Sequence, residues 1–293
     1  MTSPYLAPVR RWYDANARDL PWREPSATPW SVLVSEVMLQ QTPVPRVLPA
    51  YAAWLARWPT PAALAAASAA DAVRQWDRLG YPRRAVRLHA TAGLLMTRYA
   101  GQVPSAIEDL RSLPGIGSYT AAAVASFAFG QRHAVLDTNV RRVLARLVRG
   151  DAQPGPSQSA AERALAESLL PASGPEAARW SVAVMELGAL VCTAARPRCP
   201  ECPLAGRCEW LRNGCPPALA PRAAQGYAGT DRQCRGRLLA VLRAAPGPVP
   251  PGALETAWHD EGQQARCLAA LIADGLVARC ADGSFALPGD EPG

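Results

Sequence analysis

The feature that most constrains the fold is a succession of short helical segments, most of them closed by proline or glycine. WSVLVSEVMLQQ, for example, follows a proline and ends before TPVPR, so both of its ends carry helix-breaking signals. Similar patterns cover residues 30–41, 46–57, 61–67, 69–78, 83–99, 106–112, 118–129, 138–149, 159–170 and 176–191. These segments predict a mainly α fold, and 293 residues are enough for two or three domains.

The end of the chain has a different pattern. GRLLAVLRAA, PPGALETAW and EGQQARCLAALIADG predict three short helices, and LVARCADGSFAL predicts two strands around an Asp-Gly turn. This order is typical of a small winged-helix-like α+β module. Residues 236–293 hold 4 Arg against 7 acidic residues, and the third helix offers only Arg266 as a cation. We therefore favour packing or partner binding over the reading of a DNA groove.

The rest of the chain is strongly basic. The formal charge of the whole sequence is +7, and residues 1–235 carry a balance of +10. All 31 basic residues are arginine, because the sequence contains no lysine. Nucleic acid is a partner that fits this charge, and an ordinary arginine-rich surface fits it equally well.

The compartment follows from what the sequence lacks. MTSPYLAPVR has no apolar signal-peptide core, and no uninterrupted apolar run reaches the roughly 20 residues of a membrane span. We expect no signal peptide, no membrane association and a cytoplasmic protein. In that compartment clustered cysteines bind metal more often than they form disulfides.

Four cysteines, Cys192, Cys199, Cys202 and Cys208, lie within 17 residues with the spacing C-x6-C-x2-C-x5-C. Zinc is one interpretation, although zinc sites usually combine two C-x2-C pairs across a longer insert. A [4Fe–4S] cluster also takes four thiolates. The spacing alone does not choose between these metals, and Cys215 permits a second quartet with Cys199, Cys202 and Cys208.

Glycines mark a second motif, LPGIGSYTAAAVASFAFG, in which Gly115 and Gly117 separate two helical segments. Glycine allows a sharp turn and a close backbone approach, and the amides at the start of the next helix point at an anion. The pattern is typical of a helix-hairpin-helix that grips a DNA phosphate without reading sequence. A tight turn between two helices is the alternative.

Two carboxylates complete the set of candidate residues. Glu36 has mostly apolar neighbours one helical turn away, and burial there would raise its pKa, as a general acid requires. Pairing with an arginine is the alternative. Asp137 begins the helix of VLDTNVRRVLAR, where it could serve simply as the N-cap.

Together, these motifs resemble the MutY-type adenine DNA glycosylases of the endonuclease III superfamily. The matching stretches, from Leu20 to Cys208, are LPWRE, SEVMLQQT, LGYPRRA, LPGIGSYTA, LDTNVRR, MELGA and the cysteine run. The resemblance implies a two-domain helical helix-hairpin-helix DNA glycosylase fold plus the C-terminal module. Residues 1–29 and 130–228 would form a helical domain with the iron–sulfur loop, residues 30–129 a six-helix domain with the hairpin, and residues 229–293 the module. Cys192, Cys199, Cys202 and Cys208 would hold a [4Fe–4S] cluster.

The resemblance also implies the reaction and its residues. The enzyme would be a monofunctional DNA glycosylase of base excision repair that hydrolyses the N-glycosidic bond of adenine mispaired with 8-oxoguanine or guanine. Glu36 would protonate adenine N7, and Asp137 would stabilise the oxocarbenium-like sugar. The other matching residues are Tyr119 and Asn139 at the catalytic site, Trp22, Arg23, Leu39 and Glu186 in the adenine pocket, Gln41, Thr42, Leu79 and Tyr81 at the duplex wedge, and Gly115 and Gly117 at a DNA phosphate.

Two other functions stay open, a thymine or uracil mismatch glycosylase of the same superfamily and a non-catalytic iron–sulfur DNA-binding regulator. Glu36, Tyr119 and Glu186 favour adenine, and the presence of both carboxylates argues against a silent protein. The expected partner is double-stranded DNA with A:8-oxoG or A:G mispairs, bound by a monomer at the nucleoid. The 85 residues after Cys208 do not fit the Nudix-like domain of many MutY proteins.

The missing lysine carries one further expectation. Superfamily members that also cut the DNA strand use a lysine amine just after the hairpin glycines, where this sequence has Tyr119. Arginine cannot replace lysine in a Schiff base because its guanidinium stays protonated. We therefore expect no lyase activity.

Overall fold

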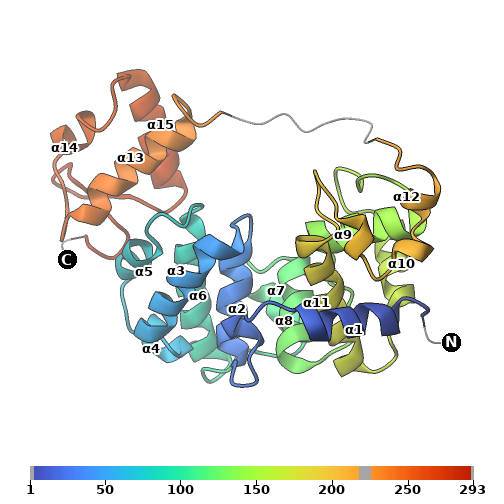
Figure 1. Cartoon of the computed structure of the whole chain (residues 1–293). Helices are drawn as coiled ribbons and strands as arrows, with labels where there is room; N and C mark the ends of the chain where they lie inside the picture. Colours follow the sequence, from blue (N-terminus) through green and yellow to red (C-terminus); the bar gives the residue numbers. More distant parts are fainter. Residues whose placement is uncertain (1–2, 218–225, 292–293) are drawn as a thin grey trace. The chain divides into compact units, whose positions relative to one another are not determined.

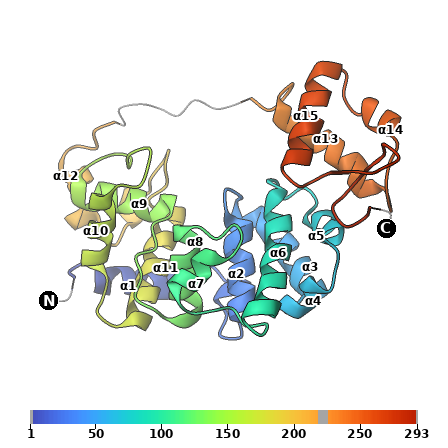
Figure 2. The same ribbon diagram turned by 180° about the vertical axis from the view of Figure 1, so that it is seen from behind.

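The computed structural model describes residues 3–217 and 226–291, and it confirms the mainly α fold (Figures 1 and 2). The helices up to the cysteine run are α1 (Leu6–Asn16), α2 (Pro29–Leu39), α3 (Val44–Arg57), α4 (Pro61–Ala65), α5 (Ala69–Trp76), α6 (Arg83–Arg98), α7 (Ile107–Ser112), α8 (Ser118–Phe129), α9 (Thr138–Leu144), α10 (Ala160–Leu169) and α11 (Gly174–Leu190). The short helix α12 (Glu209–Arg212) follows the cysteines.

Every helical segment predicted between residues 30 and 191 corresponds to a helix, with ends shifted by a few residues. The segment 138–149 divides into α9 and a π-helical turn, Ala145–Arg149. Helix α1 was not predicted. Its sequence, LAPVRRWYDAN, places Leu6, Val9, Trp12 and Tyr13 at helical spacing, and these side chains lie in or against the core of the first unit, so the apolar signal was present and was missed.

The chain forms two compact units. The first comprises residues 1–33, 104–112 and 116–222, and the second comprises residues 34–103, 113–115 and 223–293. The segments predicted from the sequence are residues 1–29 with 130–228, residues 30–129, and residues 229–293. Helices α7 and α8 fall in the first unit, and the C-terminal module falls in the second unit together with α3–α6.

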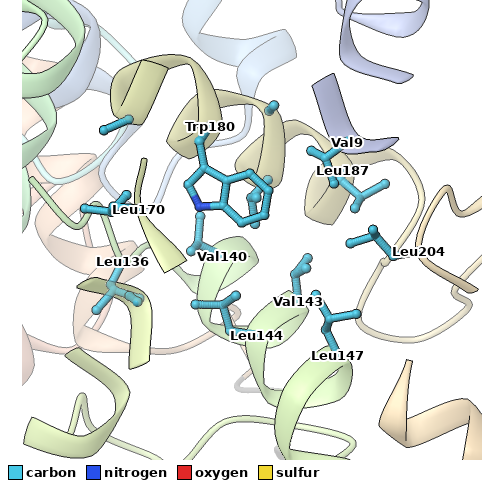
Figure 3. Packing of buried hydrophobic residues seen from close by; sticks show 14 of the residues in the cluster. Val9, Leu136, Val140, Val143, Leu144, Leu147, Leu170, Trp180, Leu187 and Leu204 are labelled. Atoms are coloured by element: carbon cyan, nitrogen blue, oxygen red, sulfur yellow. The ribbon is translucent and has the colours of Figure 1, made fainter. Parts of the chain in front are cut away.

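The core of the first unit lies between α9 and α11 (Figure 3). The indole of Trp180 is 5% exposed, and the apolar side chains around it include Val140, Leu144 and Leu187. Three of the cysteines, Cys192, Cys202 and Cys208, pack against the same core. The hydrophobic core therefore fixes the start of α9, which carries Asp137 and Asn139, and the cysteine loop relative to each other.

The second unit contains the predicted C-terminal module. Helices α13 (Asp231–Ala244), α14 (Pro251–Glu255) and α15 (Glu261–Ala273) precede strands β1 (Ala278–Arg279) and β2 (Phe285–Ala286). The strands are antiparallel, with Ala278 opposite Ala286, and Val249 forms a bridge with Phe285. Three helices and a hairpin confirm the predicted elements. None of the helices in residues 3–217 and 226–291 combines the length and the apolar composition of a membrane span.

Candidate catalytic and DNA-binding site

The two candidate carboxylates belong to different units and have different surroundings. Glu36 lies in α2 and is 5% exposed, as its apolar neighbours predicted. The part of α2 that carries Glu36 belongs to the second unit, whereas Asp137 belongs to the first. Any reaction that uses both groups therefore depends on the intact chain.

Asp137 is the N-cap of α9, and its side chain is held at both oxygens. The backbone N–H of Val140 donates to Oδ1 at 2.6 Å, and Asn139 Nδ2 donates to Oδ2 at 2.8 Å. Burial raises the pKa of Asp137, and these hydrogen bonds oppose the rise because they favour the charged form. Asp137 is thus an N-cap, as the simpler interpretation held. Its fixed orientation and raised pKa are also features of a functional carboxylate.

Arg142 extends this network to the cysteine loop. Its Nη2 donates to Asn139 Oδ1 and to the carbonyl oxygen of Gly188, both at 2.7 Å, and its Nε donates to the carbonyl oxygen of Cys192 at 2.7 Å. Gly188 allows the close approach of α11, because a Cβ there would lie 2.7 Å from Asn139 Cβ. Arg142 therefore links Asp137, through Asn139, to Cys192.

An ion-pair cluster forms at the buried Glu186 in the first unit. Its side chain is fully buried and accepts hydrogen bonds from Arg18 Nε at 2.7 Å and from Arg23 Nη2 at 2.9 Å. Burial alone would raise the pKa of Glu186, but the bonds from Arg18 and Arg23 outweigh it and lower the pKa to about 2. Arg23 Nη1 is buried and has no hydrogen-bond partner in the protein.

The structure thus brings together Arg23 and Glu186, two of the four predicted adenine-pocket residues. Of the other two, Trp22 precedes Arg23 in sequence and is buried. Leu39 is the last residue of α2 and belongs to the second unit. Arg18 was missed by the sequence analysis. It lies just before the LPWRE stretch, and nothing in its local pattern distinguishes it from the other arginines near the start of the chain.

The cysteines form a compact group of free thiols. Each of Cys192, Cys199, Cys202 and Cys208 lies within electrostatic reach of the other three. Burial, followed by the neighbouring thiols, raises the pKa of Cys202 to about 11, although a backbone hydrogen bond opposes the rise. Four thiolates this close repel one another, so the group would be stabilised by a cationic centre.

Cys192 and Cys215, the cysteines that distinguish the two possible quartets, have different surroundings, although Cys215 also lies within electrostatic reach of Cys199 and Cys208. Arg146 Nη1 donates to Cys192 Sγ at 3.4 Å, and its guanidinium also binds the carbonyl oxygens of Thr193 and Ala194. Cys192 packs on the core, whereas Cys215 is exposed. Among the residues that the structure describes, no three His, Cys, Asp or Glu side chains are arranged to hold a single metal ion.

The two hairpin glycines, Gly115 and Gly117, differ in backbone conformation and in the space around them. Gly115 has a φ of +79°, and a Cβ there would lie 2.8 Å from Arg87 Cδ, so a larger residue would strain the backbone and displace the Arg87 side chain. Gly117 is the N-cap of α8, and the space where its Cβ would stand is open. Tyr119 follows in the first turn of α8 and is half-buried.

The predicted wedge residues lie on two loops of the second unit that are joined by hydrogen bonds. Gln41 and Tyr81 are exposed and have φ values of +57° and +49°. Thr42 and Leu79 are buried beneath them at 7% and 5% exposure, and Thr42 Oγ1 donates to the Leu79 carbonyl oxygen at 3.4 Å. In this structure Gln41 and Tyr81, rather than Thr42 and Leu79, are available to a duplex.

Arg84 fixes both loops and was missed as a site residue, although it lies within the matching stretch LGYPRRA. Its Nη1 donates to three carbonyl oxygens at the end of α2, those of Val37, Met38 and Gln40, at 2.9, 2.9 and 2.6 Å. Its Nη2 donates to Thr42 Oγ1 at 2.9 Å and to the Gly80 carbonyl oxygen at 2.8 Å. Burial lowers the pKa of Arg84 to about 10.

The comparisons with known proteins can now be set beside this geometry. Residues 34–170 match the family of HhH-GPD superfamily base excision DNA repair proteins. The adenine DNA glycosylase of Mycobacterium tuberculosis is 54% identical over 283 residues, which cover 95% of this chain and 92% of the relative. The chain belongs to the adenine DNA glycosylase family. The family's protein from Mycolicibacterium smegmatis is 50% identical, with 97% of both chains covered.

More distant relatives match a shorter part of this adenine DNA glycosylase family member. The human adenine DNA glycosylase is 41% identical over 207 residues, which cover 68% of this chain and 38% of the human one. A solved thermostable thymine-DNA glycosylase superimposes with a TM-score of 0.64 at 25% identity, covering 71% of this chain and 95% of that one. A trapped endonuclease III–DNA complex at 23% identity and a TM-score of 0.60 supports the fold alone.

Proposed function

We propose that this protein removes adenine that is mispaired with 8-oxoguanine or guanine in double-stranded DNA. The observation that carries the proposal is the identity of 54% with an adenine DNA glycosylase over 95% of the chain. The buried Glu36 and the held Asp137 support it, because burial suits the acid that donates a proton and a fixed orientation suits the group that stabilises charge. The protein would act as a monomer in the cytoplasm, at the nucleoid.

The reaction would begin with the extrusion of adenine from the base stack, since its glycosidic bond is inaccessible in a duplex. The exposed Gln41 and Tyr81 would replace the lost stacking beside the partner base, and the buried Thr42 and Leu79 would support them. Trp22, Arg23, Leu39 and Glu186 would line the adenine pocket. There the unpartnered Nη1 of Arg23 could donate to the base, and Glu186, with its pKa of about 2, would stay anionic.

Glu36 would then donate a proton to adenine N7. The C1′–N9 bond breaks and its electron pair leaves with the protonated base, so positive charge develops on the sugar. Asp137, oriented by Asn139, would stabilise that charge until water adds at C1′ and loses a proton. Tyr119 would support the same site from the first turn of α8.

The cysteine loop and the hairpin would position the DNA. Cys192, Cys199, Cys202 and Cys208 would hold a [4Fe–4S] cluster, which is structural in this proposal and shapes a loop that carries Arg196, Arg198 and Arg207. The amide groups at the start of α8, beside Gly115 and Gly117, would bind a phosphate. The space beside Gly117, where a larger residue would place its Cβ, is open and would leave room for that phosphate.

A thymine mismatch glycosylase is the second candidate. The thymine-DNA glycosylase of Aeropyrum pernix is 35% identical over 206 residues, which cover 69% of this chain and 92% of that protein. The adenine glycosylases of the two mycobacteria also match the last part of this chain, and at higher identity.

A panel of duplexes tests the proposal. Single-turnover assays would compare A opposite 8-oxoguanine, A opposite guanine, and T or U opposite guanine, with the released base identified by chromatography. We expect free adenine from the first two duplexes and no base from the others. Release of thymine or uracil in preference to adenine would favour the second candidate and contradict the first.

A further inference from the structure

The loop between α5 and α6, residues 77–82, has a strained backbone. Asp77 has a φ of +41°, Gly80 of +89° and Tyr81 of +49°. Side chains larger than glycine rarely adopt this region, and such conformations persist only where the surroundings enforce them. The loop carries Leu79 and the exposed Tyr81, so its conformation decides what the protein presents beside an extruded base.

Arg84 supports the loop from within the helical bundle, and the C-terminal module supports it from the other side. Asp274, directly after α15, pairs with Arg83 at 3.0 Å and also with Arg235 of α13. Arg83 is the first residue of α6 and follows the loop directly. The Asp274 carboxylate thus ties one end of the loop to two helices of the module.

The other end of the loop has its own contacts with the module. Arg74, in the last turn of α5, pairs with Asp290 and donates to the Ala245 carbonyl oxygen at 3.0 Å. Helix α13 lies against α5 in both views of the molecule (Figures 1 and 2). Burial lowers the pKa of Arg243 in α13, and the carboxylate of Asp77, the first residue of the loop, partly offsets this effect.

We propose that the C-terminal module is a brace that holds residues 77–82 in the conformation that presents Tyr81 to the DNA. The module would therefore strengthen mispair recognition through the chain's own loop, with Asp274 as its positioning residue. A loop ordered in advance loses less conformational entropy on binding, which raises affinity. The negative balance of residues 236–293 agrees with this indirect role, since acidic surfaces do not bind phosphates. The inference rests on the proposed function.

The test uses the full chain and a duplex in which 2′-fluoro-2′-deoxyadenosine, which resists excision, lies opposite guanine. A 2-aminopurine next to that guanine brightens when the base stack is opened. Asp274→Asn should reduce the brightening at saturation and weaken binding about twofold to fivefold, the effect expected for one partly exposed ion pair. Glu255→Gln, which removes the same charge from exposed α14 of the same module, should match the wild type.

Thermal melting would show whether Asp274→Asn has a folding defect. If it has, a second variant tests the same contact. Arg83→Gln breaks the contact from the other side and leaves the Arg235–Asp274 pair in place. It should cause a similar loss, and the double variant should be no worse than the more severe single one, because both remove the same contact. Additive losses would point to a direct phosphate contact of Arg83 and would overturn the brace.

Wild-type brightening and affinity in both Asp274→Asn and Arg83→Gln would also overturn it, as would an equal loss in Glu255→Gln. Failure of the proposed function has a different signature. In that case the wild-type protein would release no adenine from the same duplex with ordinary deoxyadenosine, whatever the variants do.

Discussion

At Glu186, two arginines reverse the effect that burial has on a carboxyl group. The side chain is fully buried, yet its pKa falls to about 2 because Arg18 and Arg23 bind both of its oxygens. The motif MELGA pointed to Glu186, but its partner Arg18 comes from a segment 168 residues away in sequence. Local pattern cannot identify such a partner, since it reflects neighbours along the chain rather than neighbours in space.

The lowered pKa of Glu186 predicts a loss of stability in acid. The pKa in the folded protein, about 2, lies below the ordinary value of 4.5. The Glu186 carboxylate therefore makes its full contribution to the free energy of unfolding above about pH 4.5, and this contribution is lost as the pH falls toward 2. Full protonation would remove on the order of 3 kcal/mol. Urea unfolding between pH 7 and pH 3 should show a weaker pH dependence for Glu186→Gln than for the wild type. Equal slopes would contradict this assignment.

Arg84 illustrates the same limit of sequence analysis. It stands beside Arg83 in LGYPRRA, and the two are equivalent in composition. Only the fold places the Arg84 guanidinium among the carbonyl oxygens that end α2, while Arg83 faces Asp274.

At the scale of elements, the cysteine loop packs against the core that α9 and α11 form in the first unit. Its spacing predicted four metal ligands, and the fold adds Arg146 beside Cys192 and Arg142 between Cys192 and Asn139. The helices themselves were predictable because their apolar periodicity and their proline and glycine ends are local signals. Helix α1 carries the same kind of signal in Leu6, Val9, Trp12 and Tyr13, which lie in or against the core, and the sequence analysis missed it.

The two possible cysteine quartets make different predictions. If Cys192, Cys199, Cys202 and Cys208 hold a [4Fe–4S] cluster, the purified protein should be yellow-brown, with a broad visible absorbance from thiolate-bound iron. Cys192→Ser should lose that absorbance, and Cys215→Ser should keep it because Cys215 is exposed and stands outside the quartet. Iron analysis of both variants checks this. Stoichiometric zinc without iron, in protein prepared without air, would contradict the cluster.

At the scale of the whole molecule, the absence of lysine from all 293 residues limits the chemistry. A Schiff base with the sugar needs a nucleophilic amine, and arginine does not supply one. The enzyme should therefore release adenine and leave an intact abasic strand that breaks only under alkali. Borohydride added during turnover should trap no protein–DNA adduct, with a lysine-dependent superfamily member as the positive control. A substantial adduct that maps to the active site would refute this expectation.

The grouping of elements into units was less accessible to sequence analysis than the elements themselves. The hairpin signal in LVARCADGSFAL identified the module, but its ion pairs with α5 and α6 join residues more than 190 positions apart and leave no local pattern. The negative charge of the module favours packing over DNA contacts but does not indicate which surface is packed, and the contacts with α5 appear only in the structure.

The central claim, that Glu36 is the proton donor of an adenine glycosylase, is tested most directly by free adenine release. Wild type, Glu36→Gln and the control Glu255→Gln would be compared under single-turnover conditions on a duplex with adenine opposite 8-oxoguanine, with mispair affinity measured in parallel. Loss of the proton donor should slow release about 10²–10⁴-fold and leave the affinity close to that of the wild type. Near-normal adenine release by Glu36→Gln would contradict the account.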